Sequence, residues 1–154
     1  TSGKSTVTGM IAWILTQCGH DPTVMNGAVM KNFVSPENPH ASARLGWPGL
    51  FVSELDESDG SIALFRPTIG VVLNVSLDHK SLEELRGLFG NFLGVSGCAI
   101  INHDSAEARA LAPRLRQVIS FGVRSEDADI AVEPDSIGLG EFGLRAAVLD
   151  NVNR

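Results

Sequence analysis

The stretch that most constrains the fold is residues 69–75, Ile-Gly-Val-Val-Leu-Asn-Val, a nearly continuous run of β-branched and aliphatic side chains. Such a run predicts a strand buried on both faces, as strands are in the parallel sheets of α/β proteins. A second apolar run covers residues 97–101, and between the two runs Ser81 and Glu84 predict the capping box of a helix. The order strand, helix, strand predicts that the two strands lie parallel in one sheet.

The chain begins with Thr-Ser-Gly-Lys-Ser-Thr, residues 1–6, which matches the second half of a phosphate-binding loop. In such a loop, backbone N–H groups at a helix start face a phosphate, Lys4 reaches the terminal phosphates and the Ser5 hydroxyl binds Mg²⁺. Apolar side chains recur at helical spacing behind the loop, up to Gly19, where a helix C-cap is expected. The alternative is a frayed, basic N-terminus followed by an ordinary amphipathic helix.

Shorter apolar runs extend the alternating pattern. Further strands are expected at residues 23–25, 50–52 and 118–121. Ser105 is expected to cap a helix that Pro113 ends. Residues 129–150 hold short apolar runs separated by turn residues, which predicts an antiparallel β meander. The predicted fold is therefore α/β with three layers: a mostly parallel sheet of the phosphate-loop type with helices on both faces, plus the small meander.

Chemistry-bearing residues follow two of the expected strands. Glu54 comes directly after the run at residues 50–52, and residues 74–79, Asn-Val-Ser-Leu-Asp-His, continue from the end of the long β-branched run. In open parallel sheets, ligands bind beyond the carboxyl ends of the strands. The Ser5 hydroxyl, the Glu54 carboxylate and the His79 imidazole could hold Mg²⁺ there against nucleotide phosphates. Alternatively, the acidic stretch is a solvated loop and His79 a hydrogen-bonded loop residue.

Residues 26–49 form a long connection rich in Asn, Pro, Gly and His. Connections of this length in compact domains are usually functional or mobile. The segment contains Arg44, and a cation in a long loop near an acidic cluster could bind an anionic substrate. The alternative is an ordinary surface arginine.

The composition excludes several classes of function. The formal net charge of −6 argues against a nucleic-acid surface, and no apolar stretch approaches the length of a membrane span. Cys18 and Cys98 do not have the spacing of a disulfide framework or a metal site, and we expect both to be buried thiols in a reducing, cytoplasmic compartment. Both ends look interrupted, so we expect the chain to be part of a longer protein.

Three ordered motifs together resemble those of the Mur ligases, the ATP-dependent amide-forming enzymes of peptidoglycan assembly. Residues 1–6 are similar to the family's Gly-Thr-x-Gly-Lys-Thr/Ser loop without its leading Gly. Residues 53–59 resemble Glu-Ala-Asp-Glu-Ser-Asp of the branch that adds L-alanine to UDP-N-acetylmuramate, and residues 74–79 resemble Asn-Ile-x-x-Asp-His. The likeness spans about residues 1–92. It implies that residues 1–154 are a central ATP-binding domain, truncated at both ends.

The resemblance implies a role for each matching residue. Lys4 would contact the β- and γ-phosphates of ATP, Ser5 and Glu54 would bind the bridging Mg²⁺, and His79 would help hold a second Mg²⁺. Lys4, Glu54 and His79 are thus the implied catalytic residues. The other residues implied in nucleotide binding are Ser2, Gly3, Thr6 and Asn74.

The resemblance also implies the reaction and the partners. The γ-phosphoryl group of ATP passes to a carboxylate of a UDP-sugar, and an amino-acid amine then displaces phosphate to form an amide. Positioning and charge neutralisation suffice for such a transfer. N- and C-terminal domains would bind the sugar nucleotide and the amino acid, so this piece alone is expected to be inactive.

One departure leaves the substrate open. After Asp-His the L-alanine-adding branch usually has Met-Asp, whereas this chain has Lys80 and Ser81. Ligases of the murein tripeptide, folylpolyglutamate or cyanophycin type remain alternatives. A nucleotide switch of another class remains a further one, although a switch would usually place an Asp, not Glu54, after the apolar strand.

Overall fold

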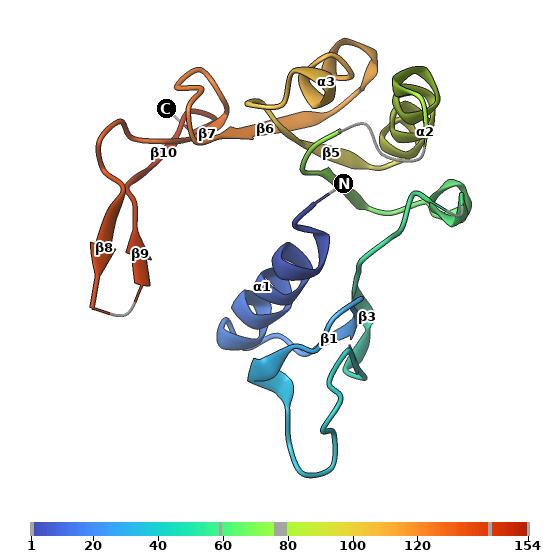
Figure 1. The fold of residues 1–154 in the computed structure, drawn as a ribbon, viewed down its shortest axis with the longest axis vertical. Helices are drawn as coiled ribbons and strands as arrows, with labels where there is room; N and C mark the ends of the chain where they lie inside the picture. The colour runs from blue at the N-terminus through green and yellow to red at the C-terminus, as the bar shows by residue number, and fades with distance from the viewer. Residues whose placement is uncertain (1, 59, 76–79, 142, 154) are drawn as a thin grey trace. The chain divides into compact units, whose positions relative to one another are not determined.

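A computed structural model of the chain describes residues 2–58, 60–75, 80–141 and 143–153 (Figure 1). The chain divides into two compact units, one of residues 2–56 and the other beginning at residue 57. Each unit contains its own sheet. Within the described residues, no helix is both long and apolar enough to cross a bilayer.

The unit of residues 2–56 is a three-stranded sheet with one long helix packed on it (Figure 1). Helix α1 (Lys4–Gln17) contacts strands β1 (Pro22–Met25) and β3 (Trp47–Ser53). Strand β2 (Ala43–Arg44) forms one edge of the sheet, and a short 3₁₀ helix, η1 (Lys31–Phe33), lies in the connection before it. The expected helix and both expected strands of this region are confirmed.

Strand β1 lies in the middle of this sheet, antiparallel to β2 and parallel to β3. Val24 of β1 is opposite Val52 of β3, and Met25 is opposite Ser53; the pairing is irregular only at the start of β1. Because the two strands are parallel and in register, their carboxyl ends lie side by side, and the chain leaves the sheet there after Met25 and after Ser53. The core beneath comprises Ala12, Val24 and Met30, with Phe33 and Val52 packed against them.

Helix α1 ends as the sequence predicts. Gly19 has a φ of 82°, its amide donates to the Thr16 carbonyl at 3.0 Å, and the His20 amide donates to the Leu15 carbonyl at 3.0 Å. This is the Schellman arrangement, in which a glycine in the left-handed region satisfies the last helix carbonyls. The chain therefore turns sharply and enters β1 three residues later.

The unit that begins at residue 57 holds a five-stranded sheet, a hairpin and short helices. Its elements are η2 (Ser61–Leu64), β4 (Ile69–Val72), α2 (Leu82–Gly94), β5 (Cys98–Asn102), α3 (Ala106–Arg109), η3 (Ala112–Arg114), β6 (Val118–Gly122), β7 (Ile130–Val132), β8 (Gly138–Gly140), β9 (Gly143–Arg145) and β10 (Val148–Asp150). The strand order is β10-β7-β6-β5-β4, with β4 to β7 parallel and β10 antiparallel to β7. Strands β8 and β9 pair as a separate antiparallel hairpin.

Helix α2 begins with the predicted capping box. The Ser81 hydroxyl accepts from the Glu84 amide, and the Glu84 carboxylate accepts from the Ser81 amide at 2.9 Å. The helix packs against β4 and β5. Full burial of a side chain such as phenylalanine stabilises a fold by about 1.5–3 kcal/mol. The side chains that α2 buries are Leu85, Phe89, Phe92 and Leu93.

Within the predicted meander of residues 129–150, the apolar run of residues 144–149 does not form one strand. That run divides into β9, which pairs with β8, and β10, which pairs with β7. The division occurs at Ala147, whose amide donates to the Ser136 hydroxyl at 3.0 Å and whose carbonyl accepts from the Glu133 amide at 2.9 Å. Such side-chain bonds compete with continuous strand pairing. The α/β class, the parallel strands and the small antiparallel addition are confirmed.

Candidate nucleotide-binding site

The start of α1 is built to expose its amide groups. Gly3, the N-cap residue, has φ 88° and ψ −4°, a left-handed conformation that glycine adopts without steric cost. Its carbonyl accepts from the Val7 amide at 3.0 Å, which closes the first turn. Among the described residues, no side chain caps α1, and its first turn carries no acidic residue. A helix N-terminus of this kind offers backbone N–H groups and a positive dipole to an anion.

Lys4, the first residue of α1, extends its side chain towards the acidic stretch. Its ammonium nitrogen Nζ lies 4.0 Å from Oδ1 of Asp56, and the two side chains are 24% and 62% exposed. A pair this exposed is screened by water and holds the ammonium weakly. The pair with Asp56 by itself therefore does little to keep Lys4 from a phosphate placed at the start of its helix.

Glu54 directly follows β3 and is fixed at both backbone and side chain. Its amide donates to the Met25 carbonyl at 2.9 Å, which continues the parallel pairing of β3 with β1. Its carboxylate oxygen Oε2 accepts from the Gly27 amide at 2.7 Å. This short bond to a charged acceptor is of the stronger, charge-assisted kind. The carboxylate is thus held at the carboxyl end of β1 and β3, where the sequence predicted it.

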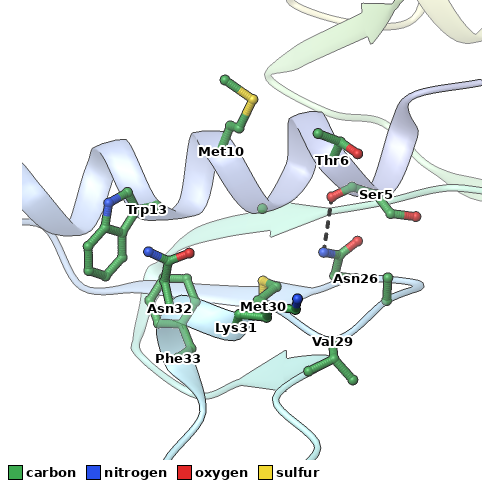
Figure 2. Close-up of a pocket in the computed structure, with 12 residues that line it drawn as sticks. Ser5, Thr6, Met10, Trp13, Asn26, Val29, Met30, Lys31, Asn32 and Phe33 are labelled. Carbon is green, nitrogen blue, oxygen red and sulfur yellow. Dashed lines mark hydrogen bonds between the residues drawn. The ribbon is translucent and has the colours of Figure 1, made fainter. Parts of the chain in front are cut away.

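Asn26, directly after the carboxyl end of β1, connects this end of the sheet to α1. Its side-chain nitrogen Nδ2 donates to the Ser5 carbonyl at 3.1 Å, as Figure 2 shows, and its own amide donates to the Ser42 carbonyl at 2.8 Å. Its side-chain oxygen Oδ1 is buried and has no hydrogen-bond partner among the described residues. Asn26 and Gly27 therefore link Ser5 to Glu54. The Asn-Gly pair resembles a stretch of the Mur ligases and, directly after a strand, is a signal for a turn, but the sequence assigned neither residue a role in the site.

A pocket with a volume of about 330 Å³ opens beside this link (Figure 2). Helix α1 and the connection after β1 supply its walls, with hydroxyl groups near one end and aromatic rings at the other. Trp13 meets the ring of Phe33 edge to face at a centroid distance of 5.6 Å. The labelled lining residues are Ser5, Thr6, Met10, Trp13, Asn26, Val29, Met30, Lys31, Asn32 and Phe33.

Arg44, predicted to bind an anionic substrate, makes several contacts within its own unit. Its Nη2 donates to Oδ1 of Asp21 at 2.5 Å and its Nη1 to the carbonyl of Pro22 at 2.8 Å. The guanidinium also lies over the ring of Phe33, 5.5 Å from the centroid. These contacts hold β2 to the start of β1. The predicted contact of Arg44 with an anionic substrate stays a prediction.

Ser2, exposed directly before Gly3, and Thr6, exposed in the first turn of α1, belong to the unit of residues 2–56. The other predicted site residues belong to the unit that begins at residue 57. Asn74 follows β4 and is half-buried. His79 lies outside the described residues, so its predicted metal role stays a prediction. Lys80 donates from Nζ to the Ser58 carbonyl at 2.8 Å, which gives this unusual lysine a contact with the end of the acidic stretch.

The donor set around α1 suits a small, hard cation. The described residues contain no group of three or more His, Cys, Asp or Glu side chains that could hold a metal by themselves. Mg²⁺ rarely needs such a group, since one or two carboxylates, phosphate oxygens and waters complete its shell. The Ser5 hydroxyl and the Glu54 carboxylate belong to residues that Asn26 and Gly27 link, and both are oxygen donors of this kind.

Known proteins resemble the chain in sequence over most of its length. A family model described as the Mur ligase middle domain matches residues 1–149. A UDP-N-acetylmuramate–L-alanine ligase of Sulfurihydrogenibium sp. is 38% identical over 136 residues, which is 83% of this chain and 28% of that protein. A relative of the same name from Lawsonia intracellularis is 36% identical over 135 residues, with 82% and 28% covered. The chain thus spans little more than a quarter of the length of these relatives.

The fold has a counterpart among solved structures. The UDP-N-acetylmuramate-alanine ligase of Thermotoga maritima superimposes with a TM-score of 0.80 at 24% identity. The alignment covers 98% of this chain and 33% of that one. At this identity the likeness establishes the fold.

Proposed function

Because the chain belongs to the Mur ligase family, whose middle domain it matches over residues 1–149, we propose that it is the ATP-binding part of an acid–amino-acid ligase. The enzyme would form an amide through an acyl phosphate in the synthesis of peptidoglycan. The observation that carries the proposal is the link from Ser5 through Asn26 and Gly27 to Glu54. This link connects the carboxylate of Glu54, directly after β3, to the first turn of α1, the helix whose start we propose binds phosphate.

In this proposal the start of α1 binds the phosphates of ATP. The backbone amides after Gly3 face the phosphate oxygens, and Lys4 leaves Asp56 to neutralise the β- and γ-phosphates. The hydroxyl of Ser5 and the carboxylate of Glu54 hold Mg²⁺, which supplies charge neutralisation as the γ-phosphoryl group transfers. The further nucleotide contacts that we propose come from Ser2, Thr6 and Asn74.

The reaction then has two displacements. The substrate carboxylate attacks the γ-phosphorus and ADP departs, which leaves an acyl phosphate. The amine nitrogen next attacks the acyl carbon, phosphate departs with the bonding electron pair, and the amine loses a proton. The role of this chain is to place phosphate and carboxylate in line and to offset the developing charge. We further propose that His79 binds a second Mg²⁺ near the carboxylate and that Arg44 binds an anionic part of that substrate.

We propose UDP-N-acetylmuramate as the carboxylate and L-alanine as the amine, since the relatives carry those names. Sites for the sugar nucleotide and the amine would lie in N- and C-terminal domains of the parent enzyme. Cys18 is exposed and Cys98 is half-buried, so the expectation of two buried thiols is wrong for Cys18. A cytoplasmic location would suit two free thiols. Murein peptides and other carboxylates are the competing substrates.

The test is ADP release by the full-length parent with ATP, Mg²⁺ and UDP-N-acetylmuramate, adding L-alanine, other amino acids and the tripeptide in turn. Release that requires the sugar nucleotide and L-alanine together supports the proposal in full. Release that requires a different amine or peptide supports the ligase and overturns the substrate assignment. Release that is independent of any amine overturns the ligase assignment in favour of a nucleotide switch.

A further inference from the structure

The amide of Gly27 and the carboxylate of Glu54 are in direct contact, which leaves no space for a side chain on Gly27. The nitrogen donates to Oε2 at 2.7 Å. A Cβ atom built on Gly27 would lie 2.8 Å from Oε2, 3.2 Å from the carboxyl carbon and 3.3 Å from Oε1. The first of these distances is shorter than carbon and oxygen tolerate without a clash. Any side chain at this position would therefore displace the carboxylate, which is the flexible partner.

The neighbouring residue holds the other side of the site. The Nδ2 of Asn26 donates to the Ser5 carbonyl at 3.1 Å, within the first turn of α1. Its Oδ1 is buried without a partner in the described part of the chain, and an unsatisfied buried acceptor destabilises the fold. A small or apolar side chain would avoid this cost. The chain nevertheless has an asparagine here, and its side-chain amide reaches Ser5. A buried oxygen without a hydrogen-bond partner calls for a functional or structural reason.

We propose that Asn26 and Gly27 are positioning residues that set the Ser5 hydroxyl and the Glu54 carboxylate for the same cation. This inference rests on the proposed function, in which Ser5 and Glu54 bind Mg²⁺. Gly27 fixes Oε2 through its N–H and thereby leaves Oε1 for the cation. Asn26 fixes the first turn of α1 relative to the end of β1. The two contacts belong to consecutive residues, so they set both ligands from one short segment.

The expected effect is large because the partners that orient metal ligands matter almost as much as the ligands. Loss of such a partner typically weakens metal affinity about 10- to 100-fold. Gly27→Ala should therefore raise the dissociation constant for the cation by that factor. Asn26→Ala, which adds no volume and keeps the Gly27 amide that binds Glu54, should raise it by a smaller factor.

The experiment measures Mn²⁺ binding by electron paramagnetic resonance in the full-length parent, with a non-hydrolysable ATP analogue present. Gly87→Ala is the matched control, because a Cβ at Gly87 of α2 meets no described atom within 4 Å. We expect weaker Mn²⁺ binding in Gly27→Ala, wild-type binding in Gly87→Ala, and similar thermal midpoints in both. Wild-type Mn²⁺ affinity in a folded Gly27→Ala protein would overturn the inference. If that variant fails to fold, wild-type affinity in Asn26→Ala would overturn it.

A double variant separates positioning from general disruption. If Gly27 acts through Glu54, adding Gly27→Ala to Glu54→Gln should weaken Mn²⁺ binding no further. Additive losses would show that Gly27→Ala disturbs the site by another route and would contradict the inference. Wild-type Mn²⁺ affinity in Glu54→Gln alone would instead remove Glu54 from the metal site, and would overturn the proposed function itself.

Discussion

The ammonium nitrogen of Lys4 lies 4.0 Å from Oδ1 of Asp56, two residues beyond Glu54. The first residue of α1 is therefore paired with the acidic stretch after β3. Asp56 is 62% exposed, and exposed pairs contribute only about 0–1 kcal/mol. The pair itself therefore opposes transfer of the ammonium to a phosphate only weakly, and it keeps Lys4 close to its proposed ligand.

Lys4→Ala should abolish ATP turnover in the full-length parent while leaving the fold intact. The lysine supplies charge to the transferring phosphoryl group, and loss of one such group costs at least about 10²-fold in rate. The weak pair with Asp56 contributes little to stability. The measurement is ADP release together with the circular dichroism melting curve. Turnover at the wild-type rate, or an unfolded variant, would count against the assigned role.

Glu54→Ala should also abolish turnover, because the proposed metal ligand is lost. Glu54→Gln keeps an acceptor for the Gly27 amide and should be folded equally well, but it removes the charge that attracts the cation. A suitable control is Glu141→Ala, which removes a carboxylate from the exposed turn between β8 and β9. Rates of ADP release across Mg²⁺ concentrations check the prediction; a Glu54→Ala enzyme as active as the control would refute it.

Arg44→Ala should raise the KM for the carboxylate substrate about tenfold and leave the KM for ATP unchanged, if Arg44 binds an anionic group. It should also lower the thermal midpoint, because its contacts with Pro22 and Phe33 are lost. Asp21→Asn weakens the same ion pair but keeps the guanidinium. Equal changes in KM in the two variants would confine Arg44 to a structural role.

Asp104→Asn should loosen the turn after β6 at neutral pH. Burial raises the pKa of Asp104, but hydrogen bonds from the Ser125 hydroxyl and from the amides of Val123 and Arg124 outweigh it, so the net pKa is lowered. A carboxylate with a lowered folded-state pKa stabilises the fold above its unfolded value, about 3.9, and this stabilisation is lost as the pH falls through the folded-state value.

The measurement for Asp104 is hydrogen exchange at the amides of residues 123 and 124, corrected for the intrinsic rates. At pH 7 the variant should lose about fivefold in protection, the equivalent of roughly 1 kcal/mol. The difference from wild type should begin to shrink below about pH 4, where the carboxylate protonates once the turn has opened, and it should vanish as the pH falls through the lowered folded-state pKa. A difference that stays constant across that range would show that the charge of Asp104 is not what holds the turn.

Local signals explain how much of the fold the sequence predicts. The capping box of Ser81 and Glu84 involves residues three apart, and Gly19 ends α1 through bonds to the preceding turn. Strands β4 and β5 follow from apolar runs typical of parallel strands, although β4 covers only Ile69–Val72 and lies at the edge of the described sheet, paired with β5. These features depend on nearby residues alone, so a single sequence suffices to locate them.

The features that the sequence did not predict depend on distant partners. The Gly27 amide meets Glu54, 27 residues later, and the Asn26 side chain meets Ser5, 21 residues earlier. Neither contact has a periodic or compositional signal. The division of residues 144–149 at Ala147 likewise depends on a hydroxyl 11 residues earlier. The motifs predicted that Glu54 follows a strand, but they did not predict that the Gly27 amide binds its carboxylate.

The parallel register of β1 and β3 has a consequence for how preparations of the enzyme are judged. Successive side chains in a strand point to opposite faces, so a slip of β3 by one residue would turn Glu54 away and break its bond to Gly27. The pairing of Val52 with the buried Val24 disfavours such a slip. Molecules that fold in the wrong register would still contain helix and sheet but would bind the cation poorly. The fraction of refolded protein that binds Mn²⁺ therefore reports folding fidelity, which a far-ultraviolet spectrum would miss.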